Sequence, residues 1–378
     1  MSEKDSIMNK LISDDGIASQ SSQSKDEERQ HIHQINALDM KSKLQTRYDD
    51  LPSPPWPQLD HRIAKAILDG TIIGFDPSQV SFDASNTIVT AYYQFTSKHG
   101  VGEYEKWFTR LLRASEPMII FLEPGSSWYD FVLKQRTHAP TIIAPIQFNE
   151  LVMSTTFTTE FWDFMFSIDL EASVHKSSNV YKIWNEKLIL MYASIHLNPF
   201  ETPNFVWMDA GYFRNDRDAP ELNTPVVKIN ITESVPEEKL LLLHVRNDPL
   251  SSPSRVNIAG NSFVGSGKSF LTIYEKYYET FWDWVSIEKF IGSDQFVMTE
   301  TCRRYKAYCH PFLPGRFKSW FGLALALSGK RDVSQVSPEF LFLDEPPSNP
   351  AIVPSGKYIS YCRNEIITSP SIQDFNCE

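Results

Sequence analysis

The sequence predicts an α/β protein in which helices cover a sheet on both faces. Residues 205–208 (FVWM) form an uninterrupted apolar run between polar, proline-containing segments, which is typical of a parallel strand buried on both faces. Residues 180–197 carry apolar side chains at spacings of three, four and seven, which indicates a long helix. Buried strands that alternate with packed helices are the pattern of the α/β class.

At 378 residues, 42% of them hydrophobic, the chain is long and apolar enough to bury a full core. We expect a single domain over residues 56–335. Residues 1–55 form a polar tail and a proline-rich connector, and we expect disorder in the tail because it has too few apolar side chains to offset the entropy of ordering. Residues 336–378 are rich in proline and predict an extension lying over the domain.

The elements follow from local patterns. Residues 87–93 are β-branched and aromatic, as in a strand, whereas residues 103–114 carry an aromatic stripe at helical spacing. Residues 157–166 are dense in aromatic side chains and predict a helix that packs in the core, with part of an acceptor cleft as the alternative. Further strands are predicted at 117–122, 141–144, 228–231 and 239–245, and further helices at 60–70, 128–135 and from about residue 294.

Asp209 is the first candidate site residue, because it directly follows the apolar run 205–208. Ligands of open α/β sheets collect at the carboxyl ends of the strands, where Asp209 would project. A carboxylate there can hold Mg²⁺ or Mn²⁺, and Gly211 would let a ligand or the backbone come close. The alternative is that Asp209 only caps the following turn, since Asp-Ala-Gly is ordinary turn chemistry.

Residues 185–187 (NEK) interrupt the apolar surface of the predicted helix 180–197. Because neighbouring helical residues point about 100° apart, we expect at most one of Glu186 and Lys187 to face a cleft. The trio resembles one that recurs at this place in the HtrL/YibB family, and the resemblance implies that Lys187 meets phosphate or that Asn185 meets a donor sugar. A solvated helix face is the alternative.

Residues 258–269 (IAGNSFVGSGKS) invite comparison with a phosphate-binding loop. The spacing argues against it, because that loop requires a glycine where Ser262 stands, and a phosphotransferase with such a loop is the third alternative. The segment instead resembles the glycine-rich strand-loop-helix of the HtrL/YibB family, and the resemblance implies that Gly260, Gly265 and Gly267 allow close approach of the backbone and point N–H groups at an oxyanion.

Five blocks together resemble the HtrL/YibB family, whose sequences are similar to nucleotide-sugar glycosyltransferases of the GT-A fold. In order they are residues 87–93, 117–121, 183–187, 198–213 and 290–295, within a span of a little over half the chain. The resemblance implies a GT-A-like, Rossmann-type mixed sheet flanked by helices. It also implies a nucleotide-diphosphate sugar as donor, an unknown acceptor, and Mn²⁺ or Mg²⁺ as cofactor.

The resemblance also implies roles for individual residues. Thr90 and Ala91 would line the nucleotide pocket, and Arg214 would reach a phosphate if its loop folds back, with a surface salt-bridge cluster as the alternative. Asp294, which stands where an N-cap or first-turn acid is expected, would meet sugar hydroxyls or act as a general base. Asp209 would bind metal and diphosphate.

His310 is a second candidate metal ligand. Residues 310–320 loosely resemble the late His…Gly-x-x-Lys-x-Trp segment of glycogenin-like transferases, although the gap from histidine to glycine is two residues too long. Many GT-A enzymes supply two acids as Asp-x-Asp, whereas Gly211 holds the third position here. This departure favours an alternative function, a non-catalytic sugar- or nucleotide-binding or interaction protein on the same fold.

Charge and cysteine content limit the partners and the compartment. A formal net charge of -11 argues against nucleic acid as a partner. No run of 18 apolar residues predicts a transmembrane segment, and no signal peptide is seen, so we expect a cytoplasmic protein, or the secretory lumen if a longer gene product carries an anchor. Cys302 and Cys309 could form a disulfide in an oxidising compartment or remain free thiols.

Overall fold

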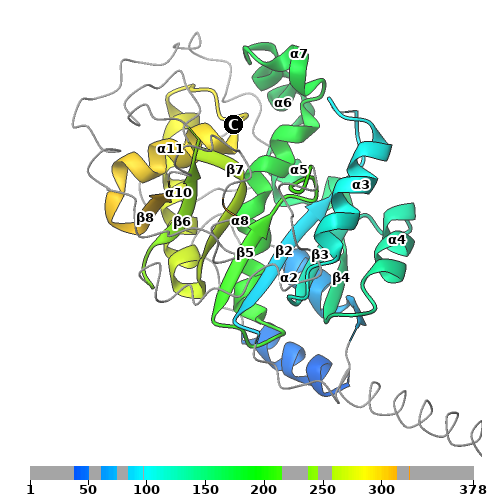
Figure 1. Cartoon of the computed structure of the whole chain (residues 1–378). Helices are drawn as coiled ribbons and strands as arrows, with labels where there is room; N and C mark the ends of the chain where they lie inside the picture. Colours follow the sequence, from blue (N-terminus) through cyan, green and yellow to red (C-terminus); the bar gives the residue numbers. More distant parts are fainter. Residues whose placement is uncertain are drawn as a thin grey trace, which may run out of the picture.

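The computed structural model describes residues 38–50, 61–74, 84–96, 98–214, 237–245, 258–312 and 323. Over this part of the chain it confirms the α/β prediction, with one mixed sheet flanked by helices (Figure 1). The strands are β1 (Thr71–Ile73), β2 (Asn86–Tyr92), β3 (Met118–Leu122), β4 (Thr141–Pro145), β5 (Asn204–Met208), β6 (Leu240–His244), β7 (Ile258–Ser266) and β8 (Cys309–Phe312). The helices are α2 (His61–Leu68), α3 (Val101–Leu112), α4 (Ser127–Gln135), α5 (Val152–Thr156), α6 (Thr159–Ser167), α7 (Ala172–His175), α8 (Asn179–Leu197), α10 (Gly267–Ser286) and α11 (Asp294–Arg304).

The strand order is β1-β4-β3-β2-β5-β7-β6-β8. Strands β4, β3, β2 and β5 are parallel neighbours, whereas β7 runs antiparallel to β5 and to β6. The chain moves outward from β2 through β3 to β4 and then crosses back to β5 on the other side of β2. The strand order therefore reverses between β2 and β5, and in a sheet of this kind a ligand crevice is expected at the carboxyl ends of these two strands.

The helices follow from these connections. Right-handed crossovers put α3 and α4 on one face of the sheet and α8, whose connection runs back across the sheet, on the other. Helix α8 packs against α2, α10, β2 and β5, so it lies at the centre of the described structure (Figure 1). Every residue of β2, β3, β5 and β6 is buried, which explains why their sequences are apolar without alternation.

The prediction of a disordered tail is wrong for residues 38–50. Residues 38–49 are helical, and Met40 and Leu44 are buried. The guanidinium of Arg47 donates hydrogen bonds to the carbonyl oxygens of Leu197 and Asn198, at the end of α8. The helix is thus fixed by apolar contacts and hydrogen bonds to distant parts of the chain, which its polar local sequence does not reveal.

Several other predictions can be compared with the described residues. Sulfur atoms of Cys302 and Cys309 are joined in a disulfide, which ties the end of α11 to β8. None of the helices that the structure describes is long and apolar enough to cross a membrane. The predicted strand 228–231, the proline-rich connector and the extension 336–378 lie outside the described residues.

Candidate functional site

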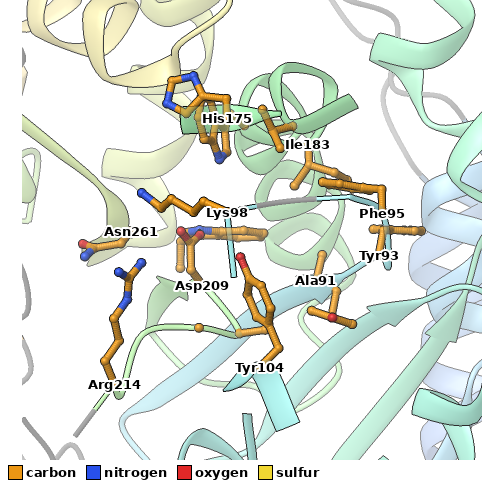
Figure 2. A pocket seen from close by; sticks show the side chains of 16 residues that line it. Ala91, Tyr93, Phe95, Lys98, Tyr104, His175, Ile183, Asp209, Arg214 and Asn261 are labelled. Carbon is orange, nitrogen blue, oxygen red and sulfur yellow. The ribbon is translucent and has the colours of Figure 1, made fainter. Parts of the chain in front are cut away.

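A pocket lies where the strand order reverses. Residues at the ends of β2 and β5 line it, together with side chains from α3, α7, α8 and β7. Figure 2 shows two chemically different sides: Lys98, Asp209, Arg214 and Asn261 point toward one another on one side, whereas Ala91, Tyr93, Phe95 and Ile183 lie on the other. The pocket therefore has a polar end and an apolar, largely aromatic end.

Asp209 reaches this pocket because β5 stops at the residue before it. Its backbone N–H donates to the carbonyl oxygen of Asn261 on β7, and its carbonyl oxygen accepts from the N–H of Tyr212, which closes the turn. The carboxylate takes no part in that turn. Instead, its Oδ1 accepts a 2.8 Å hydrogen bond from Nε1 of Trp207, and the side chain remains 33% exposed.

Lys187 stands behind Asp209, buried in α8. Its ammonium lies 3.2 Å from Oδ1 of Asp209 and 2.9 Å from Oδ2 of Asp294, and it donates a 2.7 Å hydrogen bond to the carbonyl oxygen of Gly260. Burial acts to lower the pKa of Lys187, but attraction to both carboxylates raises that pKa above its ordinary value. Lys187 therefore stays charged and links the two acids.

Asp294 is the first residue of α11, as the sequence predicts, but it is buried. Burial raises the pKa of its carboxyl, while the Lys187 ammonium opposes the rise. A Cβ atom at Gly260 would lie 2.6 Å from Oδ2 of Asp294, so the glycine makes room for the carboxylate. Asp294 touches the pocket through Lys187 and Asp209 rather than by lining it.

The glycine segment is not a loop. Residues 258–266 form β7, which pairs with β5, and α10 begins directly at Gly267. Gly265 pairs with Phe205, so Gly265 and Gly267 lie at the end of β5 opposite Asp209. Lys268 is exposed and paired with Glu238, at 2.8 Å. These glycines allow close packing of backbone and helix, and they are remote from the pocket.

The other predicted residues divide between pocket and core. Ala91 and Gly211 line the pocket, and so does Arg214, whose guanidinium stacks 4.9 Å from the ring centre of Trp107. Thr90 is buried in β2 and is not among the lining residues. Asn185 donates to the carbonyl oxygens of Tyr181 and Ile291 and accepts from the hydroxyl of Tyr277, so its polar atoms serve the core rather than a sugar.

The alternative of a solvated helix face is wrong for the whole segment 185–187, because all three side chains are buried. Glu186 accepts hydrogen bonds from the backbone N–H groups of Val152 and Met153, at the start of α5. Lys187 is connected to the pocket through its ion pair with Asp209.

The described residues do not fit a divalent ion held by the protein. His310 lies in β8, and β7 and β6 lie between β8 and β5 in the sheet. Three strand spacings, or roughly 14 Å, therefore separate β8 from the strand that carries Asp209 at its end. Oδ1 of Asp209 is already engaged by Trp207 and Lys187, and Asp209 is the one carboxylate among the described lining residues. No group of three potential ligands occurs in the described part of the chain.

Lys98, His175 and Asn261 are polar residues of the pocket that the sequence prediction did not select as site residues. Burial, and then the positive charge of Arg214, lower the pKa of Lys98, as expected of two cations that face one pocket. Lys98 lies in the segment after β2, and the rule that ligands gather at strand ends could have identified it. His175 lies in the short helix α7, for which no local signal exists.

Comparison with known proteins identifies the family. A model described as "Bacterial protein of unknown function (HtrL_YibB)" matches residues 84–299, which is more than half of the chain. The chain belongs to the HtrL_YibB family. The matched span includes β2, α8, Asp209 and Asp294, so this HtrL_YibB protein carries the whole Asp209–Lys187–Asp294 cluster within the family region.

No curated protein matches this HtrL_YibB chain. Among solved structures, mouse xyloside xylosyltransferase 1 in its apo form is similar at 11% identity, over 60% of this chain and 83% of that one, with a TM-score of 0.33. That likeness is too low to support a functional argument.

Proposed function

We propose that this HtrL_YibB protein binds a nucleotide-diphosphate sugar in the pocket at the ends of β2 and β5 and transfers the sugar to an acceptor. The observation that carries the proposal is the division of the pocket into a cationic and an aromatic side at the reversal of strand order. A nucleotide-diphosphate sugar has the same division, with an aromatic base at one end and a diphosphate further along.

Lys98 and Arg214 would hold the diphosphate and stabilise the negative charge that develops on it as the sugar departs. Tyr93 and Phe95 offer aromatic faces to the base. An acid beside a diphosphate would ordinarily repel it. Here the buried Lys187 ammonium, 3.2 Å from Oδ1, neutralises the charge of Asp209. Asp209 can then accept a hydrogen bond from a ribose or sugar hydroxyl.

A divalent cation remains part of the expectation from the family resemblance, but we assign no step to it. The fixed cations of the pocket supply positive charge without it. The requirement can be measured directly, by comparing ligand binding in the presence of Mn²⁺ and in the presence of a chelator.

The first test is a thermal-shift screen of the purified protein against UDP, GDP, CMP and their sugars, with and without Mn²⁺. A ligand at a hundred times its dissociation constant adds about 2.7 kcal/mol, which corresponds to roughly 5 to 10 °C in melting temperature. We expect one nucleotide to produce this shift, and Asp209→Asn to reduce it. Asp69→Asn removes an exposed acid outside the pocket lining and is the matched control.

Lys98→Met sharpens the test because it removes the pocket cation and keeps most of the apolar length of the side chain. Loss of a charged contact to phosphate should weaken binding about tenfold or more. Lys268→Met, an exposed lysine outside the pocket lining, should leave the affinity unchanged. Equal effects of the two variants would contradict the proposed site.

The second candidate function is binding of a nucleotide or sugar without turnover. It is favoured by the engagement of both acids, since Asp209 and Asp294 are paired with Lys187. Hydrolysis of the bound donor separates the two functions. A nucleotide that binds with no release of sugar, with or without added acceptors, would favour the binding protein.

A further inference from the structure

A second cluster of polar side chains borders the pocket, outside the Asp209–Lys187–Asp294 cluster. Nδ1 of His175 lies 2.7 Å from Oδ2 of Asp169, and the hydroxyl of Tyr181 donates to the same oxygen. The other oxygen of Asp169, Oδ1, accepts a 2.8 Å hydrogen bond from the backbone N–H of Glu171. His175 lines the pocket, and Figure 2 shows it at the edge beside Ile183.

The contacts fix both the orientation and the tautomer of the imidazole. The ring packs edge-on against Trp184, with 4.9 Å between ring centres, and its side chain is 12% exposed. Burial acts to raise the pKa of Asp169, but the hydrogen bonds from His175, Tyr181 and Glu171 lower it, so the carboxylate stays ionised. Because the ionised Asp169 can only accept, Nδ1 carries the proton between them, while Nε2 lies on the other side of the ring, 3.7 Å from Oε2 of Glu171.

The other candidate bases are less suitable. Asp294 is buried and paired with Lys187, and Asp209 accepts from Trp207 and is paired with Lys187. An efficient general base must present a lone pair to the proton that it takes, and a third group must orient it. His175 lines the pocket and is oriented by a third group, Asp169, and its Nε2 is the ring nitrogen that Asp169 leaves available.

We propose that His175 is the general base of the transfer reaction, with Asp169 and Tyr181 as positioning residues. The inference rests on the proposed function and extends it to a single displacement with inversion. The acceptor hydroxyl oxygen forms a bond to the anomeric carbon as the bond from that carbon to the diphosphate oxygen breaks. The electron pair leaves with the diphosphate, beside Lys98 and Arg214, and the hydroxyl proton passes to Nε2 of His175.

The charged and titratable groups around His175 define its pH behaviour. Asp169 and Glu171 face it from the same loop, with Oε2 of Glu171 3.7 Å from Nε2, and Tyr181 faces it from α8. Lys98 lines the same pocket. Since Nε2 must be unprotonated to take the hydroxyl proton, we expect activity to fall at low pH.

The test measures hydrolysis or transfer of the donor that the binding screen identifies, as a function of pH. His175→Gln should lower kcat about 100- to 1,000-fold and abolish the acid limb of the pH profile. The Kd for the nucleotide should change less than about threefold, because the base acts on the acceptor. Added imidazole should restore part of the activity of His175→Ala.

Asp169→Asn separates positioning from simple structural support. Removal of the carboxylate should lower kcat and move the acid limb to lower pH, since the charge that stabilises the imidazolium is gone. A loop that merely loosened would lower kcat at every pH without moving the limb. His61→Gln changes an exposed histidine at the start of α2, outside the lining residues, and it should retain the acid limb.

The outcomes distinguish the base assignment of His175 from the transferase proposal on which it rests. Turnover that His175→Gln leaves unchanged would overturn the base assignment and leave the transferase proposal standing. A protein with neither nucleotide binding nor turnover would contradict both. If His175→Gln does not fold, the imidazole resonance of His175 in the unmodified protein decides: it should titrate and move on nucleotide addition, and a resonance indifferent to both would overturn the inference.

Discussion

Two buried cations sit at opposite ends of the sheet, and they are held in opposite ways. Arg136, 0% exposed, donates to the carbonyl oxygens of Leu112, Ala114, Glu116 and Pro140, which precede β3 and β4. Lys187, 2% exposed, lies beyond the carboxyl end of β5 between two carboxylates. One cation thus meets neutral acceptors at the amino ends of the strands, and the other meets charges at the carboxyl ends.

The difference shows what each cation does. Burial lowers the pKa of Arg136 because carbonyl dipoles do not replace the lost hydration, whereas the carboxylates raise the pKa of Lys187. Arg136 holds together the chain segments that precede β3 and β4. Lys187 sets the charge of an acid that lines a pocket, so its positive charge, and not only its hydrogen bonds, matters.

The largest effect should come from Lys187→Met. This variant leaves Asp294 buried without its cation, which should lower the free energy of unfolding by about 3 to 5 kcal/mol. Urea denaturation followed by circular dichroism measures the change. The double variant Lys187→Met/Asp294→Asn should recover part of the lost free energy of unfolding. If the double variant is as unstable as the single variant, the unpaired Asp294 carboxylate does not explain the loss.

Arg136→Met should lower the free energy of unfolding by about 2 to 3 kcal/mol, because it leaves buried carbonyl oxygens without a donor and removes the cation that attracts the buried Glu116 carboxylate. Its folded fraction should bind nucleotide with unchanged affinity, since the contacts of Arg136 lie at the other end of the sheet. Calorimetric titration below the melting temperature checks this. A drop in affinity comparable with that of Asp209→Asn would refute the distinction between the two ends.

The pH dependence of stability tests the environment of Asp294. Its pKa in the folded state is raised by burial, so the folded state holds the proton at a pH where the unfolded chain has released it. The unfolding free energy of the unmodified protein, relative to Asp294→Asn, should therefore rise as the pH falls through that raised pKa toward the ordinary value. A relative stability that instead decreases would mean that Lys187 outweighs burial.

The smallest effect is expected from Lys268→Met. This lysine pairs with Glu238 at the surface, and both side chains are more than half exposed. An exposed pair of this kind contributes little to stability, because water and salt screen it. Thermal melts should show a change near the limit of detection. A large loss of stability or of nucleotide binding would instead support a phosphate-binding loop at residues 258–269.

The fold could be predicted to a large extent because its strands are buried on both faces. Segments such as Met118–Leu122 and Asn204–Met208 are read as strands from composition alone, and Asp209 follows from its place after a strand. The glycines of β7 were misread because their conformation is set by pairing with β5, some sixty residues earlier in the chain. Local sequence favours a turn there, and tertiary pairing overrides it.

The site was only partly predictable for a similar reason. Lys187 could be selected as a polar residue in an apolar helix, but its partner Asp294 is more than a hundred residues away in the chain. Their contact also depends on the missing side chain of Gly260. The orientation of His175 likewise depends on Asp169 and Tyr181, which come from a loop and a helix with no shared motif.

The most direct test of the central claim is a crystal structure of the protein with the nucleotide that the screen identifies. We predict that the diphosphate lies within hydrogen-bond distance of Lys98 and Arg214, with the base against Tyr93 and Phe95 and Lys187 still between Asp209 and Asp294. A nucleotide bound beside Lys268, or anywhere other than the pocket at the ends of β2 and β5, would contradict the account.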